Sequence, residues 1–218
     1  MRRSSGSSGS SFAAKPLFEE AFGLTTDTRP YVYLSDGGHF ENLGLYEMVR
    51  RRCRFIVAVD AGCDPDLAFD DLGNAVRKIQ IDLGITIRFD GLGAMRNRPP
   101  ATVSADDLEK IPCYAIGTID YAVDGAETGC DSGFILYVKP ACHGDEAAGI
   151  RSYAQAHPSF PHETTADQWF TESQFESYRS LGFDIMEGIL RRDDIPLRDG
   201  LMLHEAVRAL RSPWRSSP

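Results

Sequence analysis

One short string holds the residues whose types and spacing could do chemistry, Ser35-Asp36-Gly37-Gly38-His39-Phe40-Glu41-Asn42-Leu43-Gly44. An apolar, β-rich run at 31–34 precedes it, so we expect Asp36 at the carboxyl end of a buried strand, where α/β proteins bind ligands. A carboxylate there can act as a general base, and Gly37 and Gly38 would let other backbone approach it closely. The alternative is a turn in which Asp36 only caps backbone donors, and the spacing alone favours that turn.

The longer string at 34–62, LSDGGHFENLGLYEMVRRRCRFIVAVDAG, resembles the second catalytic block of the patatin-like phospholipase family. Both have Asp-Gly-Gly, a polar stretch with Asn, a helix and a hydrophobic strand, in that order. The resemblance implies an α/β acyl hydrolase with a Ser-Asp dyad, in which Asp36 is the dyad aspartate and Gly37 and Gly38 are the motif glycines. The continuation at 39–44 and the regions 157–161 and 169–170 resemble a group of large bacterial members, some with membrane-embedded parts elsewhere.

The reaction that the resemblance implies is transfer of an acyl group from an ester lipid to water through an acyl-enzyme. The serine should occupy a G-x-S-x-G elbow preceded by a glycine-rich oxyanion loop, and neither occurs in the 218 residues. Ser7, Ser8 and Ser10 lie among glycines without that pattern, and Ser35 should point to the strand face opposite Asp36. We therefore expect a fragment that supplies the dyad aspartate, is inactive alone and relies on an upstream serine-bearing segment.

Three neighbours of the motif have both a catalytic and a structural interpretation. His39 beside a carboxylate can shuttle protons. The family's mechanism needs no histidine, however, so a hydrogen-bonding loop residue is the favoured interpretation. Glu41 is interpreted as a capping acid. Asn42 either lines the site or caps the helix that follows, and capping is favoured.

Some acidic, cysteine and histidine residues resemble incomplete metal sites. His39-Phe40-Glu41 with Pro112-Cys113 matches half of the zinc-deaminase signature, but Ile116 stands where its second cysteine would be. His157, His162 and Glu163 lack zinc-motif spacing, and a turn-rich surface loop is expected there. Asp60, Asp64 and Asp66 lack the rest of a calcium loop and are interpreted as a strand-end turn. We expect neither metal nor cofactor, and a metal-dependent enzyme ranks last among the alternatives.

The composition restricts the partners and the compartment. With 32 acidic and 23 basic residues the net charge is -9, which repels nucleic acid. The dense cluster Arg50, Arg51, Arg52 and Arg54 could meet lipid, but a solvated helix end is the commoner use of such a run. Five cysteines without CxxC spacing fit a reducing compartment. Because there is no signal-peptide core and no apolar run of about 18 residues, we expect a cytoplasmic protein or one at the cytoplasmic face of a membrane.

Hydrophobic periodicity predicts the elements that must position the motif. A helix from Leu43 to Val49, with Asn42 as its N-cap, separates the strand at 31–34 from an interior parallel strand at 55–59. Further predictions are a helix at 67–83 closed by Gly84, a strand at 85–89, a loop at 91–100, a hairpin of 113–122 with 134–138, one or two helices after Ala166, and a helix at 201–210.

These elements predict one α/β domain with a mixed, partly parallel sheet flanked by helices, which the resemblance makes an incomplete patatin-like three-layer fold. Residues 1–11 are expected to be a flexible Gly/Ser tract, 12–211 the carboxy-terminal part of the domain, and 212–218 a frayed tail. The expected partners are an ester lipid, bound by the complete protein, and a second copy, paired at an exposed sheet edge. A non-catalytic binding or assembly module of the same fold is the alternative function.

Overall fold

The computed structural model describes residues 18–19, 21–24, 26, 28, 36–98, 111–122 and 132–190. By their contacts, the residues divide into two units, Met1–Phe40 and Glu41–Pro218. In the first unit the described residues include a helical turn, in which the amide of Phe22 donates to the carbonyl of Phe18. The strand predicted at 31–34, Ser35 and the helix predicted at 201–210 lie outside the described residues.

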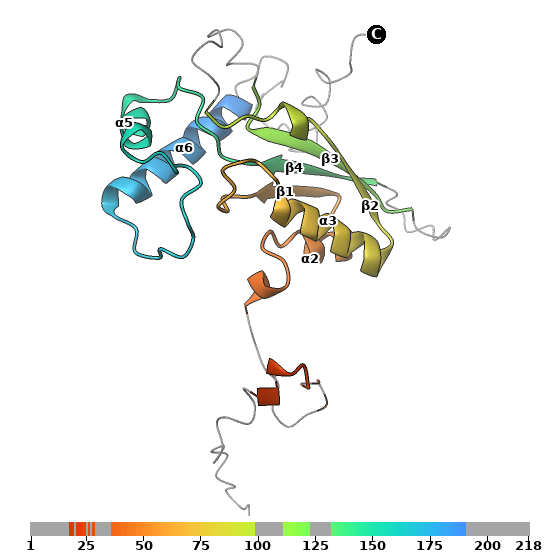
Figure 1. Cartoon of the computed structure of the whole chain (residues 1–218). Helices are drawn as coiled ribbons and strands as arrows, with labels where there is room; N and C mark the ends of the chain where they lie inside the picture. The colour runs from red at the N-terminus through yellow and green to blue at the C-terminus, as the bar shows by residue number, and fades with distance from the viewer. Residues whose placement is uncertain are drawn as a thin grey trace, which may run out of the picture. The chain divides into compact units, whose positions relative to one another are not determined.

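Among the described residues of the second unit, four strands form one mixed sheet (Figure 1). They are β1 (Phe55–Val59), β2 (Thr86–Asp90), β3 (Tyr114–Asp120) and β4 (Ser132–Val138), in the order β1-β4-β3-β2. β1 runs parallel to β4, whereas β4 with β3 and β3 with β2 are antiparallel. The structure therefore confirms the α/β class, the mixed sheet and the predicted hairpin.

The prediction that β1 is an interior strand is wrong for the described part of the sheet. β1 has one neighbour there, β4, and its residues alternate in burial. Ile56 and Ala58 are buried, whereas Val57 and Val59 are 42% and 61% exposed. A run of five apolar residues looks the same in sequence whether one face of the strand is covered or both.

Helices α2 (Leu45–Arg50) and α3 (Asp70–Leu83) cover one face of the sheet, where Leu45 and Ile79 join the buried core. α3 begins three residues later than predicted, because Leu67 and Phe69 have positive φ angles of 51° and 58°. Such angles interrupt a right-handed helix. Gly84, with φ 67°, closes α3 as predicted.

A second pair of helices packs together, and one of the two, α6, also packs against the opposite face of the sheet. α6 (Glu172–Leu190) contacts that face through Ile189, which packs with Leu136 of β4. α5 (Ala148–Ala156), which was not predicted, packs with α6 through Ile150 and Leu181. None of the described helices, α6 included, is long and apolar enough to span a membrane.

A glycine in the central strand sets the position of two aromatic rings. Gly117 of β3 lies opposite Phe89 of β2 and Ile135 of β4. A Cβ placed on Gly117 would lie 2.8 Å from the Phe89 ring, so that ring covers the glycine directly. Phe89 also meets Tyr137 edge-on, with the ring centres 6.0 Å apart. The ring of Tyr137 is thus held in the core while its hydroxyl points to the end of the sheet.

Candidate functional site

The Asp-Gly-Gly motif forms a short turn at the end of the first unit. Gly37–His39 is a 3-10 helix (η1), and Asp36 precedes it in an extended conformation. The Oδ1 atom of Asp36 accepts the His39 amide at 3.3 Å and lies 3.0 Å from His39 Nδ1. Both side chains face solvent, with 79% of Asp36 and 68% of His39 exposed. Asp36 therefore caps a turn and at the same time presents an accessible carboxylate.

Hydrogen bonding holds the pKa of Asp36 below its ordinary value. The bond with the His39 side chain contributes most, followed by the His39 amide and the charge of the imidazole. Asp36 is thus ionised at neutral pH and accepts hydrogen bonds, although it is a weak base. No described atom lies within 4 Å of a Cβ placed on Gly37. The close backbone approach expected at that glycine is therefore not seen in this part of the chain.

At the start of the second unit, Glu41 takes the capping role that was predicted for Asn42. The buried Glu41 carboxylate accepts backbone amides at the start of α2, as a capping acid should. The prediction that Asn42 is the N-cap is wrong, because Gly44 occupies that position. Asn42 Nδ2 instead donates to Asp71 Oδ1 at 3.0 Å. The polar end of the motif is thereby fastened to the first turn of α3.

A buried ion pair, which sequence reasoning missed, lies where the parallel strands β1 and β4 end. Asp60 follows β1 and Lys139 follows β4, with Lys139 Nζ 2.9 Å from Asp60 Oδ1 and only 1% and 2% of the two side chains exposed. The Tyr137 hydroxyl donates to Asp60 Oδ2 at 2.6 Å, and Lys139 also lies 3.5 Å from Asp64. The cation beside these aspartates is therefore the chain's own lysine. The signal of the pair in the sequence was an acidic and a basic residue that each directly follow an apolar run.

The strand-end turn after β1 is built around these charges. Gly62 passes so close to Asp60 and Asp71 that a Cβ there would lie 3.2 Å from a carboxylate oxygen of each. The Asp64 carboxylate accepts the amides of Ala68 and Phe69, which stabilises the turn before α3. The prediction of a strand-end turn at the aspartates is therefore confirmed.

Two groups beside the ion pair, the Tyr137 hydroxyl and the His162 imidazole, are kept uncharged mainly by burial. Burial is the largest cause of the raised pKa of Tyr137, and the charges of Asp60 and Asp64 also contribute. The hydroxyl therefore stays protonated and donates its hydrogen bond. The ring nitrogens of buried His162 have no hydrogen-bond partner among the described residues. Burial lowers the pKa of His162 and Lys139 adds to this, against the opposing effects of the Gly62 backbone, Asp64 and Asp60. His162 is accordingly neutral at neutral pH.

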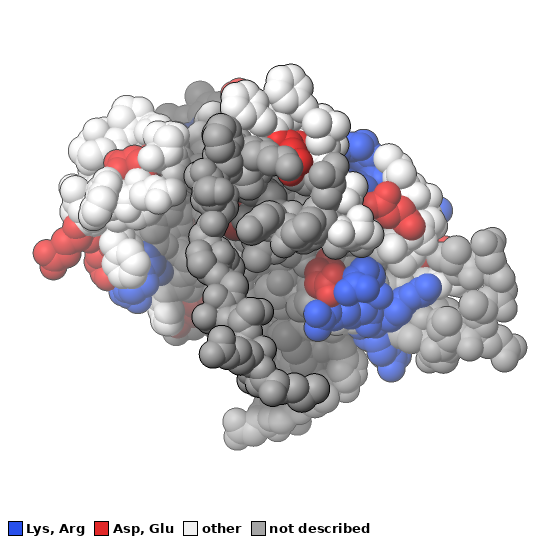
Figure 2. All heavy atoms as spheres, turned by 90° about the horizontal axis from the view of Figure 1, so that it is seen from below, with Lys and Arg blue, Asp and Glu red and all other residues white. Residues whose placement is uncertain are grey.

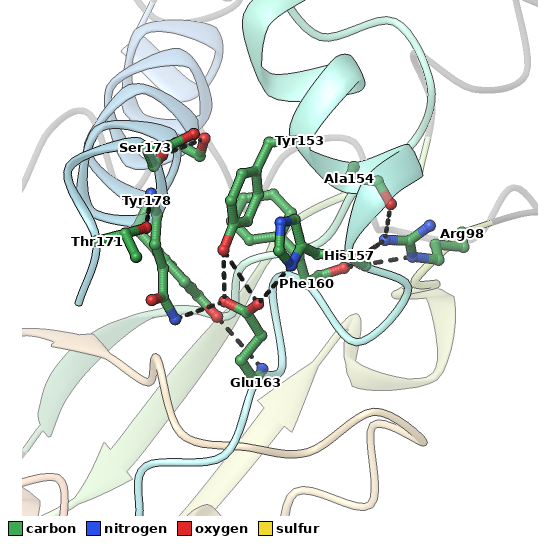
Figure 3. Close-up of polar contacts among 11 residues, drawn as sticks. Arg98, Tyr153, Ala154, His157, Phe160, Glu163, Thr171, Ser173 and Tyr178 are labelled. Carbon is green, nitrogen blue, oxygen red and sulfur yellow. Dashed lines mark hydrogen bonds and ion pairs between the residues drawn. The ribbon is translucent and has the colours of Figure 1, made fainter. Parts of the chain in front are cut away.

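The segment predicted as a turn-rich surface loop, 157–163, is turn-rich and begins on the surface, but its later part turns inward (Figure 3). Phe160 is fully buried and His162 nearly so. The Arg98 guanidinium donates to the carbonyls of Ala154, His157 and Phe160, and so satisfies the carboxyl end of α5. The turn itself was predicted correctly, but the burial of Phe160 and His162 was not, because it depends on packing and on a distant arginine.

Glu163 forms a second polar group beside that turn (Figure 3). Its carboxylate accepts the Tyr153 hydroxyl at 3.2 Å and the Gln174 amide at 3.0 Å. The Glu163 amide donates to the Tyr178 hydroxyl oxygen at 3.3 Å. Burial is the main reason that the pKa of Tyr153 rises to about 12. These contacts join α5, the turn and α6, and they engage the Glu163 carboxylate in hydrogen bonds.

The arginines at the end of α2 are engaged with neighbouring groups. Glu47 accepts from Arg50 and Arg51, each at 2.7 Å, and these bonds, Arg50 first, lower the pKa of Glu47 to about 2. Arg52 donates to the Tyr121 carbonyl at 2.6 Å and lies over its ring at 5.3 Å. Figure 2 shows a dense group of basic side chains beside acidic ones on the face seen there. The paired, solvated helix end that was expected is what the contacts show.

The described residues provide no metal centre, and two of their thiols are held in the protonated form. No group of three or more His, Cys, Asp or Glu side chains among them is arranged to hold a metal ion. Cys53, Cys63, Cys113 and Cys142 are free. Burial raises the pKa of Cys113 and of Cys142 to about 12, so neither is a thiolate at neutral pH.

Comparison with family models, with curated proteins and with solved structures finds no match to this chain.

Lys139→Met should leave Asp60 buried without its cation and lower the free energy of unfolding by about 3–5 kcal/mol. Urea denaturation measures the change. Glu47→Gln is the matched control, since it breaks an exposed pair and should have a much smaller effect. The double variant Asp60→Asn/Lys139→Met should recover part of the loss, because both charges are removed. A Lys139→Met loss no larger than that of Glu47→Gln would contradict the role given to the pair.

His162→Phe should make stability less dependent on pH in mild acid. The unfolded chain binds a proton at this histidine below about pH 6.5, whereas the pKa of the folded state is lower. Wild-type stability is therefore full above that pH and falls as the pH drops toward the folded pKa. The measurement is the difference in unfolding free energy between variant and wild type from pH 8 to pH 5, in which other titrating groups cancel. A difference that does not grow in favour of the variant on acidification would contradict the assignment.

Proposed function

We propose that this chain supplies the aspartate of a Ser-Asp dyad in a patatin-like lipid acyl hydrolase. The observation that carries the proposal is the carboxylate of Asp36, which is ionised and faces solvent within an Asp-Gly-Gly motif like that of the family. Its Oδ1 atom is bonded to both the backbone amide and the ring Nδ1 of His39. The serine and the oxyanion loop would come from outside the 218 residues, since no G-x-S-x-G occurs in them. The chain alone should therefore hydrolyse no ester.

In the proposed reaction the serine oxygen bonds to the ester carbonyl carbon while its proton passes to Asp36. The proton then moves to the leaving alcohol as the ester C–O bond breaks, which leaves an acyl-enzyme. Water repeats the sequence and releases the fatty acid. The lowered pKa keeps Asp36 ionised at neutral pH and able to take the serine proton, and it makes Asp36 a weak base that readily passes the proton on to the leaving alcohol. His39 positions Asp36 and takes no part in the proton transfer.

Asp36→Asn should lower kcat for a short-chain p-nitrophenyl ester by about 10²–10⁴-fold in the full natural protein. Asparagine keeps the shape of the side chain but cannot hold the serine proton. Asp66→Asn, at another exposed aspartate, is the control and should leave kcat unchanged. Labelling with a fluorophosphonate probe identifies the serine independently. An unchanged rate in Asp36→Asn, or no labelled serine, would exclude the dyad.

The second candidate is an assembly module, and the exposed β1 strand favours it. Within the described residues β1 has a partner on one edge only, and Val57 and Val59 are exposed on its open face. An uncovered strand edge is a template for pairing with another chain.

Static light scattering tests assembly directly, because it gives the mass of the particle in solution. A dimer that becomes monomeric in Val57→Lys would support pairing at β1, since a charge there opposes edge-to-edge association. Ile81→Lys, at an exposed position on α3, is the control and should leave the mass unchanged. A monodisperse monomer at all concentrations would rule this candidate out.

A further inference from the structure

Four large aromatic side chains are exposed just before α6 and along it. They are Trp169, Phe170, Phe175 and Phe183, with 90%, 53%, 63% and 58% of their surfaces exposed, and are called the α6 aromatic surface below. Their exposure is not explained by the Asp36 motif or by the buried ion pair. Single exposed apolar residues are common, but four exposed aromatics within fifteen residues are a feature of interaction surfaces.

Hydrogen bonds and packing hold the first part of this surface in place. The Asp167 carboxylate accepts the Trp169 amide at 3.0 Å, and Thr171 caps the helix by accepting the Gln174 amide at 3.1 Å. The Phe170 ring meets Tyr178 edge-on, with centres 6.1 Å apart. The backbone at Trp169 and the ring of Phe170 are therefore already held, which reduces the ordering that binding of a partner requires.

The charge around the aromatics is strongly one-sided. The stretch 164–187 contains five carboxylates and one basic residue, Arg179. Glu176 accepts from two nitrogens of that guanidinium, at 2.8 Å and 2.6 Å, so the single cation is neutralised. Anionic lipid is repelled by such a surface. A second copy docking face to face would bring the same carboxylates together, which disfavours self-association here.

We propose that the α6 aromatic surface docks on phosphocholine membranes. The outermost charge of that interface is trimethylammonium, a cation with no N–H to donate. Aromatic faces attract such cations, and Asp167 and Glu172 add charge attraction beside Trp169. Tryptophan also partitions into the interfacial layer of a bilayer. Docking would bring the chain to its lipid substrate, so its purpose rests on the hydrolysis proposed above. Membrane binding is measured without hydrolysis, however, so either proposal can fail while the other holds.

Phosphatidylcholine vesicles test the docking on the intact chain. Trp214→Phe leaves Trp169 as the sole tryptophan, because the chain has two. Vesicles should then shift its emission to shorter wavelength, and acyl chains carrying bromine should quench it. Trp169→Ser should weaken co-sedimentation with these vesicles by about tenfold or more. Ile81→Ser, which removes an apolar residue on α3 that is 68% exposed, is the matched control and should leave binding unchanged.

Lipid composition separates this proposal from its rivals. Binding should be weaker to phosphatidylethanolamine, whose ammonium carries N–H groups, and weakest to phosphatidylglycerol. Equal or tighter binding to phosphatidylglycerol would overturn the proposal, as would no binding to phosphatidylcholine or binding that Trp169→Ser leaves intact. Two outcomes would overturn it in favour of a protein partner. One is an oligomer that dissociates in Trp169→Ser, and the other is binding to polylysine without binding to phosphatidylcholine.

Discussion

The buried pair of Lys139 and Asp60 is the constraint on which the second unit depends. Two charges removed from water are tolerated only when other groups satisfy them, and here Tyr137, Asp64 and the Gly62 carbonyl do so. Each partner directly follows its strand, and the amide of Asp60 donates to the carbonyl of Val138 beside them. A shift of β1 by one residue would point Asp60 to the other face of the sheet. The pair therefore fixes the register of the parallel strands.

Hydrogen bonds and ion pairs continue from this pair along the strand-end turn to the start of α3. Asp64 contacts Lys139 and caps the turn before α3, while Asp71 in the first turn of α3 holds Asn42. Asn42, which follows the Asp-Gly-Gly turn in sequence, is thus bonded to the first turn of α3, and the turn before that helix is bonded to the end of the sheet. These contacts give Asn42 a structural role within the second unit.

Local signals in the sequence predicted most of the helices and strands. The features that the sequence could not predict depend on contacts between residues far apart in the chain. β1 was predicted to the residue because charges bound a five-residue apolar run, and Gly84 marked the end of α3. The motif identified Asp36, and its Asp-Gly pair predicted the turn. By contrast, Tyr137 and Asp60 are 77 positions apart, and no short pattern reports such a contact. α5 escaped notice because it is nine residues long and has no side-chain cap.

The separation of β1 from its partner also matters while the chain is being made. At a synthesis rate of about 5–20 residues per second, β1 leaves the ribosome about 4–15 s before β4 can meet it. During that interval Phe55–Val59 is an uncharged, β-prone segment of the kind that aggregates. Arg54 on one side and Asp60 on the other flank it with charge, as gatekeeper residues do. Charge on both sides of β1 therefore opposes association of this segment with other chains before β4 is there to pair with it.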